Sequence, residues 1–169
     1  MKTVIMSIRA EHNRNIESGA KTLELRTMPP TCEVPFRVLT YESGPDGRHA
    51  VTNEWICDER TLLSPTAAIL IAKAACVEPE YIREYTSLFE KRLFALSISE
   101  LKVYDKPMEL HRFFKRCDKL RCEGCEHLKF LAVNASERDW ECEFLGSRIP
   151  ITSAPQNYCY VTDALYDIK

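Results

Sequence analysis

The sequence predicts an α+β domain built around a mixed β-sheet or barrel. Its periodic segments begin with a strand and a short helix, continue through several strands, and resume as strands after a helical stretch. Strand and helix patterns do not alternate regularly, which argues against a doubly wound parallel sheet. The 169 residues, of which 45% are hydrophobic, fit one domain spanning 1–169.

The N-terminal elements are a strand, a helix and a second strand. Lys2 to Ile8 is rich in Val, Ile and Met, which is typical of a strand. Glu11 to Ser18 has the pattern of a short helix that ends at Gly19, a residue suited to the positive φ of a helix end. Leucines alternate with polar residues over 21–26, which predicts a half-buried strand with one polar face.

A hairpin and a helical insertion are predicted next. Phe36 to Tyr41 and Ala50 to Cys57 flank the turn signal Gly44-Pro45-Asp46-Gly47. From Ser64 to about Arg92, apolar residues recur at helical spacing, so we expect a helical insertion at about 64–92. The other predicted segments are a strand at 93–103, a loop with a short helix at 107–114, and a closing strand at 158–161.

The polar face of the 21–26 strand carries a cation, an anion and a guanidinium. Arg26 can hold a phosphate or carboxylate with two parallel hydrogen bonds, and Lys21 can act as a mobile point charge. Glu24 can accept a hydrogen bond from a base amino group or orient a water molecule. The same pattern also fits an ordinary ion pair on a solvated strand face.

Three sequence patches resemble a known family. Ser7-Ile8, a short helix and then Gly19-x-Lys21-x-x-Glu24-x-Arg26 resemble the N-terminal signature of the ASCH superfamily. Residues 102–107 and 155–161 are also similar to ASCH-containing proteins of bacterial and prophage genomes. The resemblance implies a PUA-like mixed β-barrel with a short N-terminal helix and a helical insertion. It also implies a positively lined cleft that binds RNA, single-stranded nucleic acid or a nucleotide.

The resemblance also raises the question of catalysis. Some small members act as acetylcytidine amidohydrolases, in which the lysine equivalent to Lys21 is catalytic and the third residue after it is a threonine. This sequence has Glu24 there. A carboxylate differs in charge from a hydroxyl that positions a water, so the sequence favours binding. Hydrolysis of modified nucleosides or RNA, with Lys21 and Glu24 as catalytic candidates, is the alternative.

A cysteine-rich loop at about 116–143 predicts a structural zinc site. Its thiolates follow zinc-ligand spacing and the four candidates are Cys117, Cys122, Cys125 and Cys142. His127 and Cys159 are alternative fourth ligands. Free cysteines that behave as small hydrophobes are the alternative, and this is the expectation for Cys32, Cys57 and Cys76.

A basic segment precedes the cysteines. Arg112, Lys115 and Arg116 flank Phe113 and Phe114 in an otherwise slightly acidic chain. Positive charge interleaved with aromatic rings suits single-stranded nucleic acid, which needs contacts to phosphates and a face for base stacking. The alternative is a solvated helix face with both phenylalanines in the core.

Two further positions are weighed as contacts to a ligand. Tyr41 could stack on a base from the end of its strand, or pack in the core with a solvated hydroxyl. The amides of Gln156 and Asn157 could hydrogen-bond a base edge, or the segment could be only a turn.

Charge and hydropathy exclude several other classes of function. A net charge of −2 and a pI near 6.1 exclude binding of nucleic acid by overall charge excess. The longest apolar run, at 67–77, is too short for a membrane span, and no signal peptide is predicted. We therefore expect a cytoplasmic protein with no membrane partner. A third hypothesis is a zinc-stabilised adaptor that binds a protein through 64–92.

Overall fold

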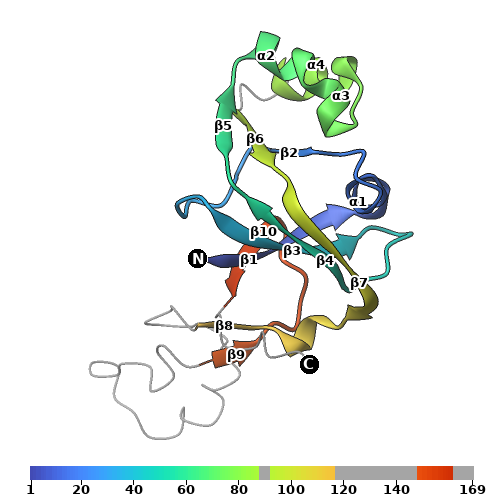
Figure 1. The fold of residues 1–169 in the computed structure, drawn as a ribbon, viewed down its shortest axis with the longest axis vertical. Coiled ribbons are helices and arrows are strands. Elements are labelled where there is room, and N and C mark those ends of the chain that lie inside the picture. Colours follow the sequence, from blue (N-terminus) through green and yellow to red (C-terminus); the bar gives the residue numbers. More distant parts are fainter. Residues whose placement is uncertain (88–91, 117–147, 162–169) are drawn as a thin grey trace, which may run out of the picture.

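The computed structural model describes residues 1–87, 92–116 and 148–161 (Figure 1). At its centre lies a five-stranded sheet with the order β10-β1-β3-β4-β7. These strands are β1 (Thr3–Arg9), β3 (Phe36–Ser43), β4 (Val51–Cys57), β7 (Ser99–Met108) and β10 (Tyr158–Val161). Strands β1 and β3 are parallel and the other neighbours are antiparallel, so the sheet is mixed.

A smaller sheet lies beside the first. It has the order β2-β6-β5, with β2 at Leu23–Arg26, β5 at Arg60–Leu63 and β6 at Leu93–Ser97. Strand β6 is followed almost directly by β7, so the chain passes from the small sheet into the large one at Ile98. The Ile98 N–H donates to the carbonyl of Thr22 at 3.0 Å, which attaches the start of β2 to this junction.

The N-terminal helix α1 spans Ala10–Glu17 and directly follows β1. Its chain leaves the helix through Gly19, whose φ of +76° is available to glycine at little cost. Ile16 on α1 is fully buried in the core, so the helix is held against the sheets by an apolar contact.

A helical insertion connects β5 to β6 and consists of α2 (Pro65–Leu70), α3 (Ala72–Ala75) and α4 (Pro79–Ser87). The hydroxyl of Ser64 caps α2 by accepting from the N–H of Ala67 at 3.2 Å. The insertion packs on the small sheet through a separate core made of Ala68, Ala72 and Ile82 with Leu93 of β6. Figure 1 shows these helices at one end of the molecule, beyond β2 and β6.

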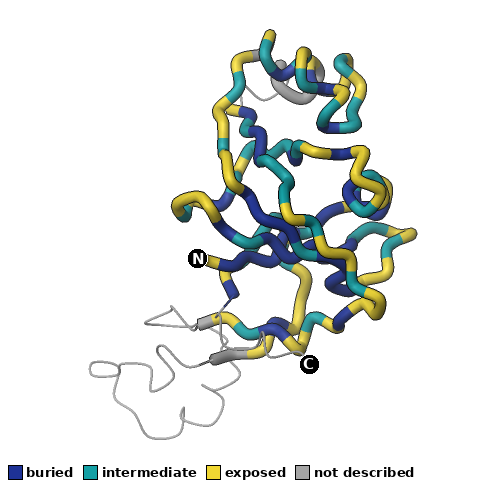
Figure 2. The backbone as a smooth tube through the Cα atoms, viewed as in Figure 1, coloured by how far each residue is buried: buried dark blue, intermediate teal, exposed yellow. Residues whose placement is uncertain are grey.

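The inner strands β1, β3 and β4 of the central sheet are buried on both faces, as the dark segments in Figure 2 show. One face packs toward α1 and the small sheet through Val4, Met6, Ile8, Ile16, Phe36, Val38, Trp55, Cys57 and Leu96. The other face packs toward the C-terminal segments through Ile5, Leu39, Tyr41, Val51, Met108, Phe113, Ile151 and Val161. Alternation along β1 and β3 assigns successive residues to these two opposite layers.

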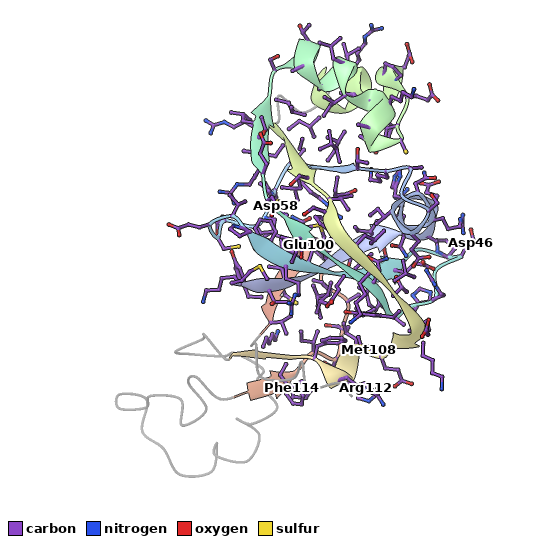
Figure 3. All side chains as sticks on the ribbon, viewed as in Figure 1. Asp46, Asp58, Glu100, Met108, Arg112 and Phe114 are labelled. Atoms are coloured by element: carbon purple, nitrogen blue, oxygen red, sulfur yellow. The ribbon has the colours of Figure 1, made fainter. Side chains whose placement is uncertain are left out.

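The second layer is covered by η1 (Leu110–Arg112), β8 (Phe114–Arg116) and β9 (Arg148–Pro150). Strands β8 and β9 form a two-stranded antiparallel ribbon. Figure 3 labels Arg112 and Phe114 at this end of the molecule, away from the helical insertion.

The predicted fold class is confirmed: the chain is α+β with a mixed sheet, a short N-terminal helix and a helical insertion. In the described ranges the strand ladders do not close into a complete ring. The sequence patterns missed β5 and the β8–β9 ribbon. They also predicted a loop from Pro107, whereas β7 continues to Met108. The sequence signal failed there because proline normally ends a strand but is tolerated in an edge strand such as β7, which pairs on one side only. No helix among the described residues is long and apolar enough to cross a membrane.

Candidate functional site

The candidate site lies on the polar face of β2, between the two sheets. Glu24 is opposite Leu96 in the β2–β6 register, and side chains of directly opposed residues point to the same face of a sheet. Leu96 is fully buried in the core layer shared with β1 and α1. Glu24 and Arg26, two residues apart on β2, therefore also face the interior and not the solvent.

Lys21, Glu24 and Arg26 form a linked, buried ion-pair cluster. Lys21 Nζ lies 3.3 Å from Glu24 Oε2, and Arg26 Nε lies 2.9 Å from Glu24 Oε1. The side chains of Lys21, Glu24 and Arg26 are only 2%, 8% and 15% exposed. This burial excludes the alternative of an ordinary pair on a solvated strand face, and it makes the cluster costly unless every charge is compensated.

Lys21 joins the cluster to the helical insertion. Its ammonium donates to the carbonyl of Ala75 at 2.5 Å, and the next residue donates its Thr22 N–H to Ala74 at 2.9 Å. Both carbonyls lie at the C-terminal end of α3, where the helix leaves carbonyls unpaired and its dipole is negative. Lys21 thus caps the insertion while it pairs with Glu24.

Arg26 is fixed by groups from three parts of the chain. Its Nη1 donates to Asn157 Oδ1 at 3.0 Å and its Nη2 donates to the carbonyl of Ser7 at 2.7 Å. Its Nε is close to Glu24 but forms no hydrogen bond of acceptable geometry within the described part of the chain. The guanidinium has more N–H donors than these two bonds use, so it can still donate to a ligand.

His12 is a member of the site that sequence reasoning did not assign. Burial lowers the pKa of the His12 imidazole, and the positive charge of Lys21 lowers it further, although Glu24 acts in the opposite direction. The ring is therefore mostly neutral at pH 7, and its side chain is 31% exposed and lies 3.5 Å from the carboxylate of Glu11. Its place on α1, between β1 and Gly19, is the signal that could have identified it.

Asn157 is a second residue of the site, and its role differs from the one that the sequence suggested. The segment 155–161 entered the sequence argument through its resemblance and through a possible base contact, whereas in the structure its amide binds Arg26. No local pattern links positions 26 and 157, because their contact depends on β10 pairing with β1.

The cluster has a surplus of positive charge. Among the described residues, Lys21 and Arg26 share the one carboxylate of Glu24, and their other contacts are to the carbonyl oxygens of Ala75 and Ser7 and the amide oxygen of Asn157. A partly buried surplus cation attracts an anion more strongly than a solvated one, because the effective dielectric constant is lower. The arrangement suits a phosphate or carboxylate that approaches Arg26.

Tyr41 is not brought to this cluster. It is buried at 8% exposure in the opposite core layer, with Ile5 and Leu39. The structure therefore favours the core alternative for this tyrosine over a base-stacking role.

The basic segment also lies on the other side of the central sheet. Phe113 is buried in the layer with Tyr41, and Arg112 and Lys115 beside it are exposed. Arg116 belongs to β8. The segment forms a short 3-10 turn and a strand instead of a helix face, and the central sheet separates it from β2 (Figure 1).

The zinc prediction falls outside the described residues. Cys117, Cys122, Cys125, Cys142 and His127 all lie in 117–147, and the zinc site stays a prediction. Among the described residues no group of three or more Cys, His, Asp or Glu side chains is arranged to hold a metal ion. Cys57 is buried in the core and Cys32 packs against it, as expected of free cysteines that act as small hydrophobes.

A second buried polar cluster lies on the other side of α1. Asn13 donates to Glu42 Oε2 at 2.6 Å and to Thr52 Oγ1 at 2.9 Å. Arg48 caps it with contacts of 2.5 Å to Glu42 and Glu17. Burial raises the pKa of Glu42, but hydrogen bonds from Arg48 and Asn13 outweigh it, so the net shift is downward and the carboxylate stays charged.

No protein-family model and no curated protein matches the sequence. Among solved structures, the ASCH protein of Zymomonas mobilis matches with a TM-score of 0.61 at 18% identity, covering 96% of this chain and 89% of that chain. Two single-substitution variants of that protein match with TM-scores of 0.62 at 15% and 16% identity, covering 96% of this chain and 92% and 89% of theirs.

The chain therefore has the ASCH fold, as its sequence patches predicted. At these identities the similarity shows the fold alone, and function has to be argued from the site.

Proposed function

We propose that this chain is an ASCH-type domain that binds RNA or a nucleotide and holds a phosphate of its ligand at Arg26. The observation that carries the proposal is that two buried cations share one carboxylate on the polar face of β2. A bound phosphate would neutralise the surplus charge and use the free N–H donors of Arg26. Glu24 would keep the two cations in place when the ligand is absent.

The site is prearranged for this task. Arg26 is held by Glu24, Ser7 and Asn157, so little side-chain freedom remains to be lost when a ligand binds. His12, whose pKa is influenced by Lys21 and Glu24, adds a mostly neutral and partly exposed ring near the cluster. A neutral imidazole can both donate and accept a hydrogen bond, which suits a sugar hydroxyl or a base edge.

The geometry favours binding over hydrolysis. A lysine that acts as a general base must present an unprotonated amine to its substrate. Lys21 instead donates to Ala75 and contacts Glu24, and it is almost fully buried. Hydrolysis of a modified nucleoside or of RNA stays the alternative implied by the sequence resemblance.

The two possible ligands share the phosphate but differ in length. A mononucleotide can reach Arg26 alone, whereas a single strand long enough to pass around the sheet could also contact Arg112 and Lys115. Fluorescence-detected binding of uridine monophosphate and of a short labelled oligouridylate, each over a range of salt concentrations, separates these cases.

The test uses Arg26→Gln with Arg112→Gln as its matched control. Both variants remove one arginine charge, but only the first acts on the cluster. We expect Arg26→Gln to lower the affinity for both ligands by roughly tenfold or more, the usual effect of losing charge-assisted hydrogen bonds. Arg112→Gln should leave the mononucleotide affinity unchanged. Equal effects of the two variants on uridine monophosphate affinity, or no wild-type binding of either ligand at low salt, would contradict the proposal.

Lys21→Met separates binding from catalysis. A binding domain should lose affinity in this variant, whereas an enzyme should lose turnover with affinity largely kept. Product analysis after incubation of the wild-type protein with acetylated cytidine and with RNA completes this comparison.

A further inference from the structure

We infer that Asn157 is a positioning residue for the proposed anion site: it holds the Arg26 guanidinium in the orientation that receives the ligand. This inference rests on the proposed function and names the residue that prepares the site. It concerns the C-terminal segment, 131 residues away from Arg26 along the chain.

The amide of Asn157 bonds at both ends. Its Oδ1 accepts from Arg26 Nη1 at 3.0 Å, and its Nδ2 donates to the carbonyl of Met28. A guanidinium can only donate and a peptide carbonyl can only accept, so these partners allow one orientation of the amide. An aspartate or a leucine of similar size could not make both contacts.

The backbone of Asn157 is fixed as well. Its carbonyl accepts from the Ser7 N–H at 3.1 Å, and the Ser7 hydroxyl donates to the carbonyl of Pro155 at 2.6 Å. The carbonyl of the same Ser7 accepts from Arg26 Nη2. Ser7 and Asn157 therefore hold each other and together hold the two terminal nitrogens of Arg26.

These contacts depend on the docking of the last described strand. β10 pairs with β1 antiparallel, with Tyr158 opposite Met6, which brings Asn157 beside Ser7. If Asn157 were absent, Arg26 would keep its contacts to Glu24 and Ser7 but lose the one that fixes Nη1. The guanidinium could then rotate about its Nε–Cζ bond. Ligand binding would have to stop this rotation, and the lost entropy would lower the affinity.

A neighbouring tyrosine provides a matched control. The hydroxyl of Tyr160 contacts the N–H groups of Thr31 and Cys32 at 3.2 Å and 3.1 Å. It thus ties the same β2–β3 loop to β10, while Asn157 ties that loop to the residue just before β10, and no hydrogen bond or ion pair in the described chain connects Tyr160 to Arg26. Tyr160→Phe tests whether loosening this loop is by itself enough to weaken binding.

The experiment measures uridine monophosphate affinity and Arg26 dynamics in full-length wild type, Asn157→Ala, Asn157→Asp, Tyr160→Phe and Arg26→Gln. Side-chain ¹⁵N NMR follows the Arg26 Nε–H signal, assigned by its loss in Arg26→Gln. We expect Asn157→Ala to weaken affinity roughly tenfold and to speed guanidinium rotation, with Tyr160→Phe within about twofold of wild type. Asn157→Asp keeps the acceptor for Nη1, so its guanidinium should stay immobile although the added negative charge weakens anion binding.

Several results would overturn the inference. The first is a uridine monophosphate affinity in Asn157→Ala equal to that of the wild type. The second is an equal loss of affinity in Asn157→Ala and Tyr160→Phe. The third is an Arg26 guanidinium that rotates as fast in Asn157→Asp as in Asn157→Ala. If Asn157→Ala fails to fold, Asn157→Asp is compared with the wild type, and faster guanidinium rotation in Asn157→Asp overturns the inference. Failure of the proposed function is distinguishable, because then Arg26→Gln would not change binding, or the wild type would bind no nucleotide.

Discussion

Removing the carboxylate of Glu24 should destabilise the protein more than removing the amine of Lys21. In Glu24→Gln two cations lose the one carboxylate that contacts them among the described residues, whereas in Lys21→Met one cation and one carboxylate remain, Arg26 and Glu24 at 2.9 Å. Both substitutions nearly preserve side-chain size, so packing changes are small. The difference between the variants therefore reports the charge balance of the cluster.

The structure sets the expected magnitudes. Breaking a buried pair and leaving an uncompensated charge costs about 3–5 kcal/mol, and this range applies to Glu24→Gln because all three side chains are at most 15% exposed. Lys21→Met loses mainly the bond to the Ala75 carbonyl, which corresponds to about 1–2 kcal/mol. For a domain of this size we expect melting temperatures lower by roughly 10 °C and roughly 4 °C, respectively.

Urea unfolding followed by circular dichroism measures the two free energies, and equal slopes in urea would confirm that the variants unfold from comparable states. Lys21→Met should also increase hydrogen exchange at the Thr22 amide, which donates to α3. A Glu24→Gln variant as stable as Lys21→Met would refute the reasoning that Glu24 is the single counter-charge for both cations.

Three further predictions concern other parts of the chain. Because burial and Lys21 lower the pKa of His12 below 6.5, the unfolded chain binds its proton more readily. Wild-type stability should therefore fall relative to His12→Gln as pH drops below about 6.5, measured as urea midpoints at several pH values. Burial raises the pKa of the Cys57 thiol to about 11, so it should resist a thiol reagent at pH 8 in folded protein and react after unfolding. Metal analysis of protein purified without chelator should find zinc that is lost in Cys122→Ser; absence of zinc in the wild type would contradict the four-cysteine site.

The helical insertion has a direct bearing on the site. Carbonyl groups of its α3 accept hydrogen bonds from the Lys21 amine and the Thr22 N–H, so the insertion is attached directly to the cluster. Its outer surface exposes Leu70 and Tyr81 at 80% and 55%. The adaptor hypothesis, in which this segment binds a protein, stays a prediction.

Local patterns predicted most of the elements correctly. The alternation at β2, the helix that ends before Gly19 and the turn signal between β3 and β4 are short-range features, and each is present in the structure. β5 was missed because its four residues alternate weakly beside the stronger helical signal that starts at Ser64. β8 was missed because its pairing partner β9 lies far along the chain.

The amino-acid sequence by itself determined the fold class and the residues of the polar strand, because strand alternation and helix capping act within a few residues. Only the tertiary structure decided that Lys21 and Glu24 are buried, that Asn157 and His12 join them, and that Tyr41 and the basic segment lie in or beyond the opposite core layer. Those facts depend on which strands pair and which face of each sheet is covered. Such long-range contacts leave no periodic trace in a single sequence.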